Sequence, residues 1–149
     1  MRKITPLKLI MLVDDDDTTN YLNQRLLENL NAAEKIVIMK DGEEALNYLT
    51  KACEAGNTGE YICPDLMFLD IKMPVMDGFE FLDAYKEAKL NFGKEIVIMM
   101  LTSSASFYDL EKLKQYPDVK KHYSKSLTEV DVKDIIQEHF PQNISRAEE

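Results

Sequence analysis

The chain has 149 residues, a length at which one domain with a single core is expected, and its 45% hydrophobic and 30% charged residues are typical of a folded protein. Its 18 Lys and Arg residues against 27 Asp and Glu residues leave a formal charge of −9. This charge repels phosphate backbones and anionic lipid heads, so we expect no direct binding to nucleic acid or to a membrane.

The start of the chain carries neither an export signal nor a membrane span. Leu9–Val13 is a short apolar run before four consecutive aspartates, whereas a span needs about 20 apolar residues. Cys53 and Cys63 do not have the spacing of a CxxC metal or redox pair, so we expect both to be reduced thiols. Together these features predict a cytoplasmic location.

Short apolar runs alternate with helical patterns along the chain. The runs are too short for helices and too continuous for half-exposed strands, so they predict strands buried on both faces. Asp16 or Asp17, Asp41 and Asp77 are expected to start helices, with Glu44 three residues after Asp41. The predicted strands are 9–13, 36–39, 66–69, 96–101 and a polar edge strand at 119–124. Five apolar stripes with helical spacing predict the helices: Leu22/Leu26/Leu27/Leu30, Ala45/Leu46/Leu49, Phe79/Leu82, Leu110/Leu113 and Val132/Ile135/Ile136/Phe140.

Strands that alternate with helices predict βαβ units and a parallel sheet. We therefore expect an α/β fold, a five-stranded doubly wound parallel sheet with helices on both faces, over residues 9–140. Residues 1–8 and 141–149 are expected to be frayed tails, and residues 53–64 a long surface loop. Because nine residues follow Phe140, we expect no output domain.

Polar residues follow each predicted strand, and in such sheets ligands bind beyond the carboxyl ends of the strands. Asp14 and Asp15 follow the first strand, Asp70 the third, Thr102 the fourth and Lys125 the fifth. Several carboxylates in one cleft stay ionised together only with a cation, and oxygen ligands of this kind suit Mg²⁺. A carboxylate can form an aspartyl phosphate, so the pattern predicts phosphoryl transfer to Asp70.

The strings VDDDD, FLDIKMPVMDG and LTSS, followed by a late Lys125, resemble the receiver domain of bacterial response regulators. The resemblance covers roughly residues 9–140 and implies the flavodoxin-like receiver fold and a two-component signalling function. It also implies a role for each matching position: Asp70 is phosphorylated, Asp14, Asp15, Asp70 and the carbonyl of Lys72 hold Mg²⁺ with Asp15 as a direct ligand, Thr102 is the switch hydroxyl and Lys125 contacts the phosphate.

The sequence departs from the family pattern at two positions. The family usually has proline in a cis bond after the lysine, where this chain has Ser126. Its switch aromatic usually lies three residues before the lysine, where this chain has His122 with Tyr123 beside it. We expect His122, or failing that Tyr123, to change rotamer on phosphorylation.

The resemblance implies a stand-alone response regulator, a phosphoacceptor rather than an enzyme, which catalyses only its own phosphorylation and dephosphorylation. The phosphoryl group would come from a histidine kinase or a phosphotransfer protein. Because no output domain is expected, the signal would pass to a separate protein.

Other functions remain open on the sequence. Asp14, Asp16 and Thr18 form a DxDxT string that resembles the haloacid-dehalogenase phosphatases, with Asp14 as nucleophile, although this interpretation leaves Asp70 unexplained. A degenerate receiver that serves only as an interaction module is a second alternative. A calcium loop starting at Asp14 fails, because Thr19 stands at the required glycine and Arg25 at the bidentate acid.

Overall fold

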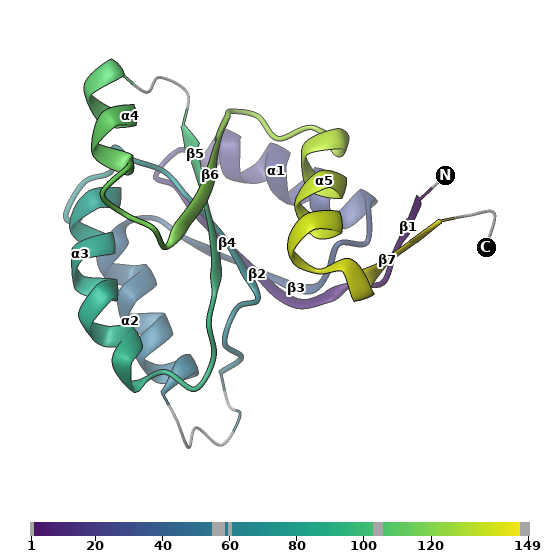
Figure 1. Ribbon diagram of the computed structural model, residues 1–149, viewed down its shortest axis with the longest axis horizontal. Helices are drawn as coiled ribbons and strands as arrows, with labels where there is room; N and C mark the ends of the chain where they lie inside the picture. The colour runs from purple at the N-terminus through teal and green to yellow at the C-terminus, as the bar shows by residue number, and fades with distance from the viewer. Residues whose placement is uncertain (1, 55–58, 60, 103–105, 147–149) are drawn as a thin grey trace.

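The computed structural model describes residues 2–54, 59, 61–102 and 106–146. At its centre lies a five-stranded sheet of order β3-β2-β4-β5-β6, in which all neighbouring strands are parallel (Figure 1). Each predicted strand is present, and β2 and β3 begin earlier than predicted. The bounds are Leu7–Val13 for β2, Ala33–Met39 for β3, Leu66–Leu69 for β4, Val97–Thr102 for β5 and Val119–Ser124 for β6.

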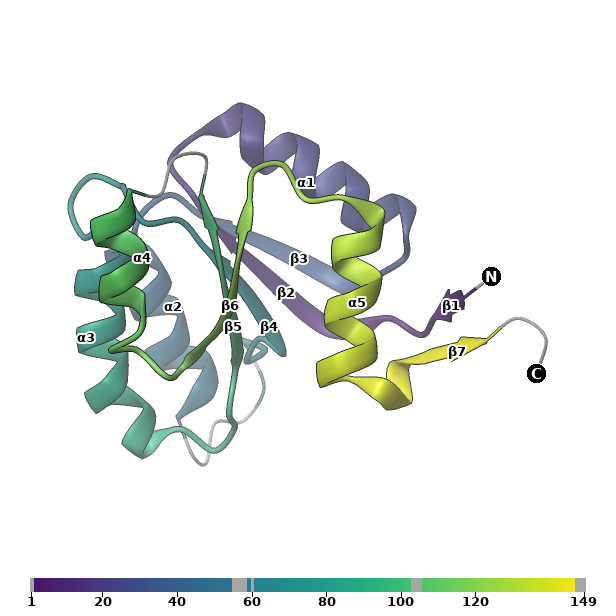
Figure 2. The same cartoon turned by 45° about the horizontal axis from the view of Figure 1, so that its top comes forward.

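Helices cover both faces of this sheet, as predicted (Figures 1 and 2). Alternate residues of β2 show the two layers, because Met11 packs against α2 and α3 whereas Ile10 packs against α1 and α5. None of the helices in the described ranges is long and apolar enough to cross a membrane. The bounds are Asp17–Asn29 for α1, Gly42–Cys53 for α2, Gly78–Ala88 for α3, Phe107–Leu113 for α4 and Glu129–His139 for α5, with 3₁₀ turns η1 at Lys89–Asn91 and η2 at Pro141–Asn143.

Aspartate side chains cap three of these helices, as predicted. Asp16 accepts a hydrogen bond from the Thr18 N–H at the start of α1, and Asp41 accepts one from the Glu44 N–H at the start of α2. Asp77 forms a capping box with Glu80 at the start of α3. These caps satisfy backbone donors that a helix leaves free at its first turn.

The burial pattern corrects two predictions. The inward face of α1 carries Thr19, Asn20, Asn23 and Leu27, whereas Leu22 of the predicted apolar stripe is 48% exposed. Strand β3 was predicted to be buried on both faces, but it is the second edge of the sheet and its residues are half-buried or exposed. An edge strand has a partner on one side only, so its burial is less complete.

The described parts of the predicted frayed tails, residues 2–8 and 141–146, are ordered, which is a further correction. Residues 7 and 8 belong to β2, and strands β1 (Arg2–Ile4) and β7 (Ile144–Arg146) pair as an antiparallel ribbon beside α5 (Figure 2). Ile4 is buried against α1 and α5, and Ile144 packs on the same cluster. The two segments are also joined by the β1–β7 ladder and by hydrogen bonds between Thr5 and Asn143.

The two cysteines also differ from expectation, because Cys53 and Cys63 form a disulfide. Cys53 ends α2, and its Cα atom lies 4.8 Å from the Cα atom of Cys63. The Tyr48 hydroxyl donates to the carbonyl of Ile62 at 2.8 Å, which fixes the returning segment against α2. The ten-residue separation of the two cysteines does not show whether their sulfur atoms meet in the fold, which explains why reduced thiols were predicted.

We expect Cys53→Ser to lower the free energy of unfolding by about 2–3 kcal/mol, because the bridge removes loop-closure entropy from the unfolded chain. Urea unfolding without reductant measures this loss, and Cys63→Ser is the matched variant, with an equal effect. Reduction of the original protein should give the same loss. If the unreduced, unfolded protein titrates with two thiols per chain, the disulfide is absent and the prediction is wrong.

Candidate functional site

Two buried aspartates lie side by side at the carboxyl end of the sheet. Asp14 directly follows β2 and Asp70 directly follows β4, and the Asp70 N–H donates to the carbonyl of Val13 at 2.9 Å. Their exposed fractions are 4% and 6%. Carboxylate oxygens of Asp14, Asp15 and Asp70 lie within 4.8 Å of one another, so the strands bring the predicted acids to one point.

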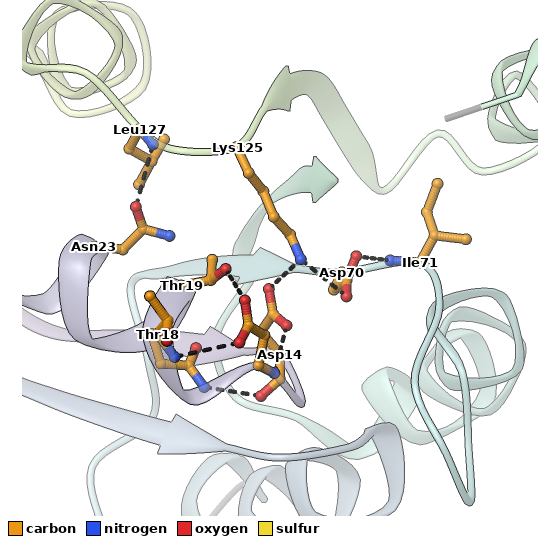
Figure 3. Close-up of polar contacts among 10 residues, drawn as sticks. Asp14, Thr18, Thr19, Asn23, Asp70, Ile71, Lys125 and Leu127 are labelled. Atoms are coloured by element: carbon orange, nitrogen blue, oxygen red, sulfur yellow. Dashed lines mark hydrogen bonds and ion pairs between the residues drawn. The ribbon is translucent and has the colours of Figure 1, made fainter. Parts of the chain in front are cut away.

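The Lys125 ammonium lies between the two buried carboxylates (Figure 3). Its Nζ is 2.6 Å from Oδ2 of Asp14 and 3.2 Å from Oδ2 of Asp70. The peptide bond from Lys125 to Ser126 is cis, although no proline follows the lysine, and the Lys125 N–H donates to the carbonyl of Thr102 at 3.3 Å. The loop therefore delivers the lysine to the predicted acids with Ser126 in place of proline.

Oδ2 of Asp14 makes this cluster suitable for a cation. Among the described residues it is the buried side-chain oxygen without a well-oriented hydrogen-bond donor, and its near neighbour is the Lys125 ammonium, with which it forms an ion pair. Hard divalent cations bind oxygen ligands that have free lone pairs, and Asp15 and Asp70 offer further oxygens within reach. The three carboxylates thus fit a divalent cation.

The charges of the cluster shift the pKa values of its members. Burial, and next the negative charge of Asp14, raise the pKa of Asp70 to about 6, against the opposing effect of Lys125. Burial alone would lower the pKa of Lys125, but its contacts with Asp14 and Asp70 outweigh burial and raise this pKa. Lys125 therefore stays charged, while the ionisation of Asp70 is disfavoured in the metal-free site.

The segment after Asp70 is held closely against the site. Oδ1 of Asp70 accepts a hydrogen bond from the Ile71 N–H at 2.8 Å, and the Gly78 N–H donates to the Ile71 carbonyl at 2.7 Å. A Cβ atom at Gly78 would lie 2.4 Å from the carbonyl oxygen of Asp70, closer than any side chain allows. Glycine at this position lets the start of α3 approach the backbone of Asp70 and Ile71.

The other predicted site residues lie around this cluster. Thr102 is the buried last residue of β5, and the side chains of Asp15 and Lys72 are exposed. Ser103 and Ser104, the rest of the LTSS string, lie outside the described residues. The structure thus gathers Asp14, Asp70, Lys125 and Thr102 at one edge.

The two candidate switch residues face opposite sides of the sheet. His122 pairs with Met100 and Tyr123 with Leu101 in the β5–β6 ladder, so His122 shares a face with Met100 and Thr102. Tyr123 packs on the other face, against the cluster of α1 and α5. Of the two candidates, His122 is therefore the one on the same face of the sheet as Thr102.

Sequence reasoning missed two polar residues behind the site. Asn20 donates from Nδ2 to the carbonyl of Asp14 at 2.8 Å, and Oδ1 of Asn23 accepts from the Leu127 N–H at 3.1 Å (Figure 3). Both are buried on α1. The available signal was their helical spacing with Leu27, which places all three on one face, but the leucines nearby suggested a different stripe.

Residues 10–137 match the family model of the response regulator receiver domain. The chain belongs to this family. As a receiver domain it is a signalling phosphoacceptor, and the match favours this function over the phosphatase alternative, which would have made Asp14 the nucleophile.

Individual relatives agree with the family match. The probable methanogenesis regulatory protein FilR2 of Methanothrix harundinacea is 32% identical over 104 residues, which are 70% of this chain and 63% of that protein. Response regulator Rcp1 of Synechocystis is 33% identical over 100 residues, 66% of this chain and 64% of Rcp1. The matched segment thus spans less than two thirds of either relative.

Solved receiver structures superpose on the fold. The Mn²⁺-bound form of response regulator Rcp1 has a TM-score of 0.68 and 27% identity, and the match covers 87% of this chain and 92% of Rcp1. The phosphorylated cyanobacterial phytochrome response regulator RcpA has a TM-score of 0.70 and 28% identity, with 91% and 96% coverage. Both confirm the predicted receiver fold.

We expect Asp70→Asn to stabilise the metal-free protein at pH 7.5 by an amount on the order of 2 kcal/mol, because each unit of pKa shift corresponds to about 1.4 kcal/mol. The raised pKa of Asp70 means that the folded state binds more protons than the unfolded state between about pH 4 and pH 6. Stability is therefore lost as pH rises through this window, and the advantage of the asparagine variant should shrink at pH 5.5.

Urea unfolding in EDTA at the two pH values measures this difference. Glu87→Gln, which neutralises an exposed carboxylate on α3, is the control and should change stability by less than about 0.5 kcal/mol. An asparagine variant that is less stable than the original protein at both pH values would show that ionised Asp70 is favourable in the fold.

Proposed function

We propose that this receiver domain accepts a phosphoryl group on Asp70, in an Mg²⁺-dependent reaction, from a histidine kinase or a phosphotransfer protein. One observation carries the proposal: the Lys125 ammonium contacts Asp70 and Asp14 together, in a cluster of three carboxylates. This arrangement holds one buried carboxylate beside a cation that can pair with the oxygens of an incoming phosphoryl group. A cytoplasmic location is part of the same proposal.

The proposed chemistry needs Asp70 as an ionised carboxylate. One of its oxygens forms a bond to the phosphorus atom of the donor while the bond from phosphorus to the leaving group of the donor breaks. No proton leaves Asp70 in this step. The hydrogen bond from the Ile71 N–H to Oδ1 fixes the orientation of the carboxylate, and the Lys125 ammonium attracts the phosphoryl oxygens.

The proposed ligands of the metal ion are Asp14, Asp15, Asp70 and the backbone carbonyl of Lys72. When bound, Mg²⁺ would neutralise negative charge on the transferring phosphoryl group. The carboxylate cluster and the Mn²⁺ ion in the structure of Rcp1 support a divalent cation. The oxygen-only ligands favour Mg²⁺ over softer metals, which prefer nitrogen or sulfur.

For the output step we propose Thr102 as the switch hydroxyl and His122 as the side chain that follows it. A dianion at Asp70 would draw the hydroxyl inward, and the two residues share one face of the sheet. Tyr123, the second candidate, packs on the opposite face. Phe107, Tyr108 and Val130 are largely exposed on α4 and α5, so this region offers an apolar surface to a downstream protein.

We expect a small acyl phosphate with Mg²⁺ to add one phosphoryl group, and we expect hydroxylamine to remove it, because an aspartyl phosphate is a mixed anhydride. Intact-mass measurement and peptide mapping check this result. Asp70→Asn should abolish labelling, and Asp15→Asn should abolish both labelling and Mg²⁺ binding, because few charged ligands offset the dehydration of the ion.

Lys72→Ala is the matched control, because truncation leaves its backbone carbonyl in place. It should bind Mg²⁺ and label as the original protein does. Modification of Asp14 instead of Asp70 would support the phosphatase alternative, and a protein that binds Mg²⁺ but cannot be labelled would support the interaction module.

NMR with beryllofluoride, a mimic of the phosphoryl group, tests the output step. We expect shift changes at Thr102 and His122, and further changes along the exposed face of α4, β6 and α5, because the hydroxyl movement opens space that His122 can fill. Tyr123 should change less than His122. Changes confined to the immediate neighbours of Asp70 would contradict this route.

A further inference from the structure

The inward face of α1 carries two amide side chains where a helix usually packs apolar residues. Asn20 is 3% exposed and Asn23 is 2% exposed. Burying an amide is unfavourable unless its polar atoms are hydrogen-bonded, so each of these residues has to gain specific bonds in the fold. Asn20 bonds to the carbonyl of Asp14, which belongs to the site itself.

Asn23 bonds to the loop that carries the lysine. Its Oδ1 accepts from the N–H of Leu127, two residues after Lys125 and 104 residues after Asn23 itself (Figure 3). On the other side of the lysine, the Lys125 N–H donates to the carbonyl of Thr102. The lysine loop, residues 125–127, is therefore bonded to β5 through the N–H of Lys125 and to α1 through the N–H of Leu127.

Asn23 also lies directly behind the two carboxylates. A cavity of about 10 Å³ is lined by Asn20, Asn23, Asp14 and Asp70 together with apolar residues of the sheet. This volume is close to the smallest that holds one water molecule, so little room exists for solvent to replace the amide. Without the Asn23 oxygen, the buried N–H of Leu127 would lose its partner and the loop would shift to find another.

We propose that Asn23 is a positioning residue, which fixes the lysine loop to α1 so that the Lys125 ammonium stays between Asp14 and Asp70. This inference rests on the proposed phosphorylation of Asp70. In this proposal Asn23 acts on the reaction through Lys125, because the hydrogen bond that its Oδ1 accepts comes from the loop after the lysine. A displacement of about 1 Å can slow a reaction by a large factor, which makes such a contact measurable.

The test is a double-mutant cycle on the labelling rate at saturating Mg²⁺ and acyl phosphate. Asn23→Leu removes the acceptor at similar volume and should slow labelling about tenfold or more. In a Lys125→Ala background the same substitution should change the rate by less than about twofold, because the group through which it acts is gone. Asn23→Ala replaces the leucine variant if the latter does not fold.

Leu27→Ala is the matched structural control, because Leu27 is buried on the same face of α1 and packs in the apolar cluster, but its side chain has no polar atom that could bond the backbone of the loop. It should lower stability and leave the labelling rate unchanged at a temperature where the protein is folded. Two results would overturn the proposal: an Asn23→Leu effect that is equally large with and without Lys125, or a Leu27→Ala variant that labels as slowly as Asn23→Leu.

Amide hydrogen exchange separates this inference from the proposed function. In Asn23→Leu the Leu127 amide should lose at least tenfold of its protection, while the amides of α1 keep theirs. A wild-type protein that is not labelled at Asp70 would refute the proposed function. The exchange result would still show whether Asn23 holds the amide of Leu127. Unchanged protection of Leu127 would refute the positioning role in either case.

Discussion

The charge balance at the carboxyl end of the sheet is the constraint around which this fold is organised. Asp14 and Asp70 directly follow neighbouring strands in which Val13 is in register with Leu69, and burying two adjacent ionised carboxylates is unfavourable without a compensating cation. Lys125 provides that cation from a loop far along the chain. The structure must therefore hold three distant segments in fixed relative positions.

Several contacts serve this single requirement. Gly78 allows α3 to begin directly beneath the Asp70 carbonyl, and the capping box at Asp77 fixes where that helix starts. On the opposite face of the sheet, α1 bonds to the backbone of Asp14 through Asn20 and to the lysine loop through Asn23. The site is thus supported from both helical layers, and apolar packing alone would not give it this geometry.

The sequence was sufficient to predict the features that follow from local pattern. Asp14, Asp70 and Lys125 each come directly after a recognisable strand, and parallel strands end at one edge, so their meeting point followed from the order of elements. The hydrogen bond between Asn23 and Leu127 could not be predicted in this way, because the local sequence around each residue does not indicate which distant residue it contacts. The cis bond before Ser126 likewise has no local signal without proline.

The errors in the prediction have a common physical origin in tertiary contacts. Leu22 fits an apolar stripe by its spacing, but the direction in which α1 crosses the sheet decides which stripe faces inward. The ten-residue separation of Cys53 and Cys63 does not show whether the fold brings their sulfur atoms together. The terminal strands are too short and polar to be recognised alone, and they are ordered through their pairing with each other and the contacts of Ile4 and Ile144 with the core.

The terminal ribbon has a consequence for the order in which the molecule folds. Its two strands, residues 2–4 and 144–146, are separated by nearly the whole chain, so the entropy of closing that loop opposes their pairing until the sheet between them has formed. Two isolated strands of this length are also too weakly held to persist without the surface on which they pack. We therefore expect the ribbon to form after the sheet and to open before it.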